Sequence, residues 1–153
     1  MGKTVARNKQ AFRNFDFEEF YEAGMVLQGT EVKSLREGRC SLKDGYAKVT
    51  DEEVFLHNVH IARYDQGNRE NHEPRRKRKL LLRKAEIKRL IGKTQQKGYS
   101  LIPVEIYFKS GYAKVKLGLG KGKKEYDKRR KIKERDQQRR VEKELKEHTR
   151  QGY

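Results

Sequence analysis

The sequence predicts a mainly β protein, a small antiparallel barrel with short inserted helices, followed by a basic C-terminal tail that is disordered in the free protein. Two observations carry this prediction. The stretch SLIPVEIYFKSGYAKVKLGL alternates apolar and polar side chains on both sides of a two-residue turn, as a β-hairpin does. Beyond residue 120 aliphatic side chains become rare, so residues 121–153 cannot bury enough apolar surface to fold alone.

The first predicted strand begins in the stretch FRNFDFEEF, where Phe15 and Phe17 alternate with polar residues. An apolar run, MVL, follows Gly24. Because glycine inside a strand often marks a bulge, we expect a long, bent strand with a bulge near Gly24. Residues 1–11, which precede it, are basic and are expected to form a flexible arm.

Two short helices are predicted between the strands. The first runs from an N-cap at Thr30 to a stop at Gly38. The second is amphipathic and should end near Gly98. Its apolar stripe consists of Ile87, Leu90 and Ile91.

The remaining strands are shorter, apart from the final hairpin. Residues 46–49 and 54–61 are separated by a tight acidic turn, and residues 80–82 form a strand after an exposed loop over 66–73. The hairpin turns at Ser110-Gly111, and its apolar faces consist of Ile102, Val104, Ile106 and Phe108 on one strand and Ala113, Val115, Leu117 and Leu119 on the other. Strands of this kind with two inserted helices suggest a barrel like the oligonucleotide-binding (OB) fold.

The charge of the chain indicates a polyanionic partner. Lysine and arginine number 39 against 22 aspartate and glutamate, which gives a formal net charge of +17. We expect no membrane partner, because no apolar run approaches the roughly 20 residues of a membrane span and the charged N-terminus lacks a signal-peptide core. The single cysteine, Cys40, fits a reducing compartment. Nucleic acid in the cytoplasm is therefore the expected partner.

Signatures of an enzyme are weak. On one strand, His57 and His60 would point to opposite faces, so we do not expect them to share a metal ion. Paired carboxylates such as Glu18-Glu19 fall in expected edges and turns. The stretch GLGKGKK lacks the Ser or Thr that follows the lysine of a nucleotide-binding loop. We therefore expect no catalytic residue, no metal and no cofactor.

Three basic stretches are candidates for RNA contact. HNVHIARY combines Asn58, His60, Arg63 and Tyr64, a mixture of stacking, hydrogen-bonding and charged groups that suits non-helical RNA. Residues 75–79 form a dense basic run beside an apolar one. GLGKGKK alternates glycine with lysine, which would let backbone amides and ammonium groups approach a phosphate backbone. Reading of DNA by a major-groove helix is disfavoured, since no helix-turn-helix or zinc-finger spacing appears.

Five long segments carry a resemblance to a known family. In chain order they are EAGMVLQGTEVKSLREG, HNVHIARY, NHEPRRKRKLLL, IGKTQQKGYSLIPVEIYF and LGLGKGKKEYDKR. Together they resemble the SmpB family, the SsrA (tmRNA)-binding proteins. The resemblance implies an OB-like barrel, which we expect to be monomeric, that binds the tRNA-like domain of tmRNA. It also implies delivery of tmRNA to the empty A site of stalled ribosomes for trans-translation, which rescues the ribosome and tags the nascent chain.

The resemblance further implies two functional sets of residues. The tmRNA-binding set is Glu31, Lys33, Arg36, Asn58, His60, Arg63, Tyr64, Lys121, Lys123 and Lys124. The ribosome-binding set, directed at the small-subunit decoding centre and mRNA channel, is Tyr126, Asp127, Lys128, Arg129, Lys131, Lys133 and Arg135. Glu31 is unusual in a basic set unless its carboxylate accepts hydrogen bonds from a base or orders neighbouring arginines.

The predicted organisation therefore has three parts. Residues 1–11 form the basic arm, residues 12–120 the OB-like RNA-binding barrel, and residues 121–153 a basic tail that becomes helical on the ribosome. The alternative is another OB-barrel translation protein or ribosomal RNA-binding protein, but such proteins lack a helix-forming basic tail joined through GKGKKEYDKR. A metal-dependent nuclease would need clustered carboxylates, which the sequence does not show.

Overall fold

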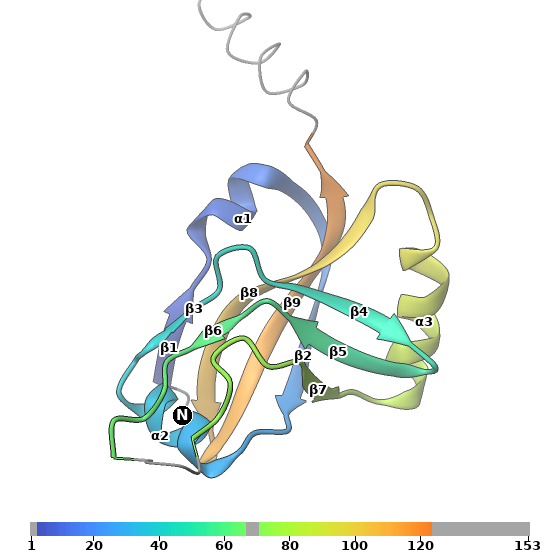
Figure 1. The fold of residues 1–153 in the computed structure, drawn as a ribbon. Coiled ribbons are helices and arrows are strands. Elements are labelled where there is room, and N and C mark those ends of the chain that lie inside the picture. The colour runs from blue at the N-terminus through green and yellow to red at the C-terminus, as the bar shows by residue number, and fades with distance from the viewer. Residues whose placement is uncertain (1–2, 67–70, 124–153) are drawn as a thin grey trace, which may run out of the picture. The chain divides into compact units, whose positions relative to one another are not determined.

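The computed structural model describes residues 3–66 and 71–123 of the chain (Figure 1). The chain divides into two compact units, Met1–Gly122 and Lys123–Tyr153. The elements of the first unit are β1 (Lys3–Arg7), α1 (Lys9–Asn14), β2 (Phe15–Met25), α2 (Gly29–Arg36), β3 (Cys40–Ser41), β4 (Tyr46–Thr50), β5 (Glu53–His57), β6 (His60–Ile61), β7 (Arg78–Leu81), α3 (Lys84–Thr94), β8 (Tyr99–Lys109) and β9 (Tyr112–Gly122).

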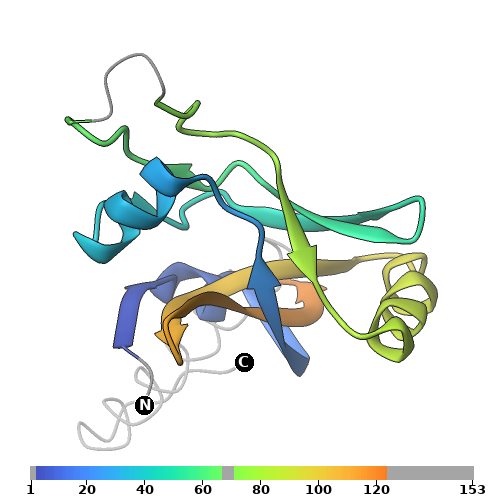
Figure 2. The same ribbon diagram turned by 90° about the horizontal axis from the view of Figure 1, so that it is seen from below.

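Six strands form a closed ring. The main sheet has the order β1-β8-β4-β5-β7-β2-β9, and β9 pairs back with β8, which closes the ring and leaves β1 attached to the outside of β8. All of these pairings are antiparallel. Strands β3 and β6 form a separate two-stranded sheet beside α2 (Figures 1 and 2). The predicted fold class, a small OB-like antiparallel barrel with inserted helices, is confirmed.

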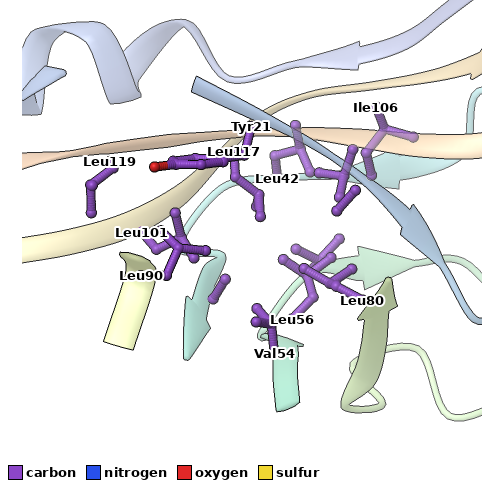
Figure 3. Packing of buried hydrophobic residues seen from close by; sticks show 14 of the residues in the cluster. Tyr21, Leu42, Val54, Leu56, Leu80, Leu90, Leu101, Ile106, Leu117 and Leu119 are labelled. Carbon is purple, nitrogen blue, oxygen red and sulfur yellow. The ribbon is translucent and has the colours of Figure 1, made fainter. Parts of the chain in front are cut away.

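The barrel interior is filled by one apolar cluster to which every strand of the ring contributes (Figure 3). Leu35 of α2 and Leu90 of α3 enter the same cluster and have no exposed surface, so both helices are anchored by burial. The ring strands contribute the fully buried aliphatic side chains of Val54, Leu56, Leu80, Leu101, Ile106, Leu117 and Leu119.

The β8–β9 hairpin turns where the sequence predicts. Ser110 and Gly111 have φ angles of 52° and 82°, the left-handed pair that a tight two-residue hairpin needs. The predicted apolar face of β8 is not continuous, however. A bulge between Pro103 and Glu105 shifts the register, so Ile106 points into the barrel while Val104 packs in a second, outer apolar cluster. An extra residue in a strand reverses the alternation after it, and no periodicity rule locates that residue beforehand.

The bulge of β2 lies at a different place from the predicted one. The register of β2 against β9 shifts between Phe17 and Glu19, not near Gly24. Gly24 pairs with Lys114 of β9 and with Leu81 of β7, so it stands where β2 passes between two partners. Its missing side chain leaves room for Leu81, whose Cβ would lie 3.4 Å from a Cβ added at Gly24.

The helix termini partly match the prediction. Helix α2 begins one residue before Thr30, with Gln28 as its N-cap in a reciprocal capping box with Glu31. It ends as predicted, because Gly38 has a φ of 73° and donates its amide to the carbonyl of Leu35 at 2.9 Å. Helix α3 ends at Thr94, four residues before Gly98, which instead supports the turn into β8.

The predicted flexible arm contains regular structure. Lys3–Arg7 pairs with the outer edge of β8, and Asn8 then caps α1 by accepting the amide hydrogen of Ala11 at 3.2 Å. The Asn8 side chain also donates to the carbonyl of Pro103 at 3.3 Å. Val5 and Ala6 pack on the core, and these two small apolar side chains were too short a signal to predict a strand.

Candidate nucleic-acid interface

The interface begins with a carboxylate buried under α2. Glu31 has no exposed surface and forms ion pairs with Arg76 and Arg78, and Arg78 is also fully buried. Glu31 accepts the amide hydrogen of Gln28 at 2.8 Å as well. Arg78 donates to the carbonyls of Val59 at 2.7 Å and Pro74 at 3.0 Å. The Glu31–Arg78 pair therefore ties α2 to β7, and Arg78 joins both to the residue before β6 and to the turn at Pro74.

Electrostatics keeps this carboxylate ionised. Burial raises the pKa of Glu31, but hydrogen bonds from Arg76 and Gln28 and the charge of Arg78 outweigh that effect and leave the pKa below its usual range. The buried guanidinium of Arg78 has its pKa lowered by burial, opposed by the charge of Glu31. A buried ion pair of this kind is stable only with both partners and their additional hydrogen bonds present.

Glu31 therefore does not lie on an exposed RNA face, which corrects the expectation for this residue. Of the two roles considered for it, the geometry matches the ordering of neighbouring arginines. The signal missed in the sequence is the alternation RKLL in β7, where Arg78 takes an inward position two residues before the buried Leu80. Hydrophobicity rules place an arginine outside, so its burial depends on the partner supplied by α2.

The segment after β5 breaks where a continuous strand was predicted. Asn58 has a φ of 59°, which ends β5 at His57 and starts β6 at His60. The two histidines therefore lie in different strands and sheets and not on opposite faces of one strand. The side-chain amide oxygen of Asn58 accepts a hydrogen bond from the guanidinium group of Arg75 at 2.8 Å.

Tyr64 is held in place from two sides. Asn71 donates to the Tyr64 carbonyl at 2.6 Å and accepts its amide hydrogen at 3.0 Å, which clamps the two ends of the intervening loop. The ammonium group of Lys33 lies 5.4 Å from the centroid of the Tyr64 ring. The neighbouring His72 is buried and joins Thr30 to the carbonyl of Ile61, both at 2.8 Å.

The contacts of Lys33 with Tyr64 and of Asn58 with Arg75, and the chain that runs from Asn58 to Tyr64, contain half of the predicted tmRNA-binding set. We call the group the α2 surface, and it consists of Lys33, Asn58, His60, Arg63 and Tyr64 together with Arg75. Arg36, also predicted, lies on the same helix but turns toward β8, with its guanidinium carbon 4.6 Å from the ring centroid of Phe108. Arg75 was part of a basic run noted in the sequence but was not assigned a role.

The glycine–lysine end of β9 lies far from the α2 surface. Arg36 reaches Phe108, which pairs with Ala113 at the start of β9, whereas Lys121 lies eight residues further along the same strand. At about 3.4 Å per residue in an antiparallel strand, that separation is roughly 27 Å. The predicted tmRNA-binding set is therefore divided between two opposite ends of a strand, and Figure 1 shows α2 near the beginning of β9.

The glycines at this end serve packing. The ring of Phe17 covers Gly118, where an added Cβ would come within 2.6 Å of it. At Gly120 an added Cβ would overlap the backbone carbonyl of Asp16. The close approach that the sequence suggested for phosphate is thus occupied by β2, while Lys121 stays exposed with its ammonium group 5.2 Å from the Tyr99 ring centroid.

The other predicted residues fall at or beyond the edge of the described chain. Lys123 is the last described residue and begins the second compact unit. The residues that lie outside the described ranges are Lys124, Tyr126, Asp127, Lys128, Arg129, Lys131, Lys133 and Arg135.

Several other types of site were considered in the described ranges. Over residues 3–66 and 71–123, no three His, Cys, Asp or Glu side chains lie together as a metal site would require. No described helix has the length and apolar character needed to cross a membrane. Burial raises the pKa of the Cys40 thiol to about 11, against a smaller opposing effect of Arg78, so this cysteine is a poor nucleophile.

Comparison with known proteins identifies the family of the chain. The family model described as SmpB protein matches residues 5–147. The chain is 58% identical over 149 residues to the SsrA-binding protein of Halalkalibacterium halodurans, covering 97% of each chain. It is 57% identical over 141 residues to the SsrA-binding protein of Bacillus subtilis, covering 92% of this chain and 90% of that one.

Solved structures give the same result. A structure described as "tmRNA-SmpB: a journey to the center of the bacterial ribosome" is similar, with a TM-score of 0.67 and 52% sequence identity, over 82% of this chain and 88% of that chain. Sequence and fold thus match the same proteins over nearly the whole chain, and the chain belongs to the SmpB family.

Proposed function

We propose that this protein binds tmRNA through its tRNA-like domain and delivers it to the empty A site of stalled ribosomes for trans-translation. The observation that carries the proposal is membership of the SmpB family, with relatives named SsrA-binding proteins and a 52% identical structure of tmRNA-SmpB and the ribosome. The net charge of +17 supplies the attraction for RNA. The protein acts in the cytoplasm as an RNA-binding adaptor and not as a catalyst.

The α2 surface is the part of the barrel that we assign to tmRNA. Its groups match what folded, non-helical RNA requires: the Tyr64 ring for stacking, Asn58 for hydrogen bonds to base edges, and Arg63 for phosphate. Buried Glu31 acts indirectly, since it fixes Arg76 and Arg78 and with them the segment that carries Arg75. Preorganised cations bind an anion at lower entropic cost than mobile ones.

Lys121, Lys123 and Lys124 form a second predicted contact, at the far end of β9. A tRNA-like domain is long enough to touch both ends of one barrel, so the separation of about 27 Å along β9 is compatible with a single RNA. The residues from Tyr126 to Arg135 are assigned to the ribosome, and we propose that the tail becomes helical when ribosomal RNA neutralises its charge. Tyr126 would stack on RNA of the decoding centre.

The test separates the barrel from the tail. Arg63→Ala should weaken binding of tmRNA about tenfold or more, because one phosphate or base contact contributes about 1–3 kcal/mol. The matched control is Lys88→Ala, an exposed lysine on α3, which should bind as the wild type does. Filter binding with tmRNA measures both variants. Wild-type affinity of Arg63→Ala for tmRNA would show that the α2 surface does not bind it.

The tail requires a second measurement. A protein shortened after Lys124 should bind tmRNA with its barrel but fail to support tagging of a nascent chain on a truncated message in a reconstituted translation system. Tyr126→Ala should give a milder defect in tagging. If the shortened protein tags at the full rate, or no longer binds tmRNA, the division of labour between barrel and tail is wrong.

A further inference from the structure

We propose that the outer face of the β4–β5–β7 sheet binds unpaired RNA bases, as an RNA site additional to the α2 surface. Three rings and three lysines occupy this face. They are Tyr46 and Lys48 of β4, Phe55 and His57 of β5, Lys77 immediately before β7, and Lys79 within it. We call this group the aromatic face.

The strand alternation fixes which side these residues take. Ala47 lies buried between the exposed Tyr46 and Lys48, and Val54 and Leu56 have no exposed surface on either side of Phe55. The register places Tyr46 opposite His57 and Lys48 opposite Phe55. Phe55 in turn lies opposite Lys79 of β7. One row across the strands therefore sets Tyr46 beside His57, and the next row sets Phe55 between Lys48 and Lys79, on the outside of the barrel.

The rings present flat surfaces. Tyr46 and His57 stack with their planes 9° apart and their centroids 5.1 Å apart, and 44% of Tyr46 is exposed. The ammonium group of Lys77 lies 4.4 Å from the centroid of the Phe55 ring. Bases of single-stranded RNA stack on exposed rings of this kind while nearby cations contact the phosphates.

The charges define which end of the face takes RNA. The turn Asp51-Glu52 and Glu53, which pairs with Lys79 at 3.4 Å, make one end acidic. The other end, at Tyr46 and His57, continues through Asn58 to Arg75. Partial burial, together with the charges of Lys77 and Lys48, lowers the pKa of His57, which favours the neutral ring for stacking.

The face is also accessible within the described chain. Figure 1 shows β4 and β5 uncovered at the front of the barrel, and the view from below in Figure 2 shows no described helix or strand above them. Helix α3 lies at the end of these strands and not on their outer side (Figure 2). A short single-stranded segment therefore has room to lie across the strands.

The experiment replaces one ring in the full-length protein and measures binding of a short fluorescent uridine oligoribonucleotide. Tyr46→Leu removes the ring but keeps apolar bulk, and it should lower affinity about five- to a hundredfold. Tyr46→Phe keeps the ring and should bind as the wild type does. Tyr112→Leu is the matched control, because Tyr112 is 72% exposed beside the β8–β9 turn, on strands that do not form the aromatic face, and should have no effect.

Two checks keep the result interpretable. Thermal unfolding of each variant shows whether Tyr46→Leu is folded, and Lys77→Gln gives an independent loss of oligonucleotide affinity if it is not. With the wild type, an oligonucleotide carrying 4-thiouridine should crosslink to the peptides of β4 and β5. Unchanged oligonucleotide affinity of a folded Tyr46→Leu, or crosslinks confined to other segments, would overturn the proposal that the aromatic face binds RNA.

The unpaired bases could belong to tmRNA or to ribosomal RNA, and two arms distinguish them. Loss of affinity of Tyr46→Leu for isolated tmRNA assigns the bases to tmRNA, and loss for small ribosomal subunits assigns them to ribosomal RNA. If neither affinity falls, the proposal is wrong. Arg63→Ala, measured in parallel, reports on the α2 surface alone, so failure of the aromatic face leaves the proposed function standing.

Discussion

Two of the ion pairs that join a helix to the barrel, Glu31–Arg78 at α2 and Arg89–Glu19 at α3, differ in burial. At α2, Glu31 and Arg78 are both fully buried. At α3, Arg89 pairs with Glu19 of β2, and their side chains are 54% and 27% exposed. In the first pair each charge has lost its water and depends on its partner, whereas water and salt screen the second. The comparison teaches that α2 is fixed by its charge network, while α3 depends on Leu90.

This difference bears on RNA binding. The α2 surface rests on segments that the buried network ties together, and its Arg75 is also held by a hydrogen bond to Asn58 before RNA arrives. At the other end, Lys93 and Lys121 both lie over the ring of Tyr99, at 5.5 Å and 5.2 Å, on an exposed surface. We expect the α2 surface to select RNA by shape. We expect Lys93 and Lys121 to add an electrostatic attraction that salt weakens.

The largest effect should come from breaking the buried pair. Glu31→Ala leaves Arg78 charged and unpaired in the interior, and it should lower the free energy of unfolding by about 3–5 kcal/mol. Glu19→Ala, the same substitution in the exposed pair, should cost under about 1 kcal/mol. Urea unfolding followed by circular dichroism measures both. Similar losses of unfolding free energy for the two variants would contradict the distinction between the buried pair at α2 and the exposed pair at α3.

Two glycine-to-alanine substitutions should change the stability of the protein in opposite directions. Gly120→Ala would force a Cβ into the backbone of Asp16, and we expect a loss of about 1–3 kcal/mol in unfolding free energy. Gly92 in α3 has nothing within 4 Å of an added Cβ, so Gly92→Ala should stabilise the protein by about 0.5–1 kcal/mol. Melting temperatures that move in the same direction for both variants would contradict this account.

Elements with strong local periodicity were predictable, and long-range contacts were not. The β8–β9 hairpin follows from alternation around Ser110-Gly111, and the end of α2 follows from Gly38. The bulge between Pro103 and Glu105 did not follow, because it depends on how β8 closes the ring with β4, β9 and β1. Strand β1 was missed because its stability comes from pairing with β8 and not from its own composition.

The candidate site was predictable to a similar extent. The chemistry of Asn58, Arg63 and Tyr64 is visible in one short stretch, and the resemblance to a family added Lys33. The burial of Glu31 could not be inferred, since it requires Arg78, 47 residues away along the chain. The aromatic face escaped notice for the same reason. Its rings are ordinary strand residues in the sequence, and only the register places Tyr46 beside His57.

The smallest expected effect concerns the pH dependence of the exposed pair. Hydrogen bonds from Arg89 and Tyr21 lower the pKa of Glu19 to about 2, despite some opposition from burial. Because the folded pKa lies below the unfolded one, this carboxylate adds stability above about pH 4.5 and loses it as the pH falls toward 2. Arg89→Gln removes the main partner, so the wild type should be only slightly more stable than the variant at pH 6.

That difference should shrink by roughly half or more between pH 6 and pH 3, as Glu19 becomes protonated during unfolding. Urea unfolding of both proteins at several pH values measures it. Glu31 provides the internal comparison, because the pKa of its carboxyl group is also lowered but its partner Arg78 is buried. Adding salt should therefore reduce the Arg89→Gln difference at pH 6 while leaving the cost of Glu31→Ala nearly unchanged. A salt-insensitive Arg89→Gln difference would mean that the pair at α3 is effectively as buried as the one at α2, and the contrast between the two ends would fail.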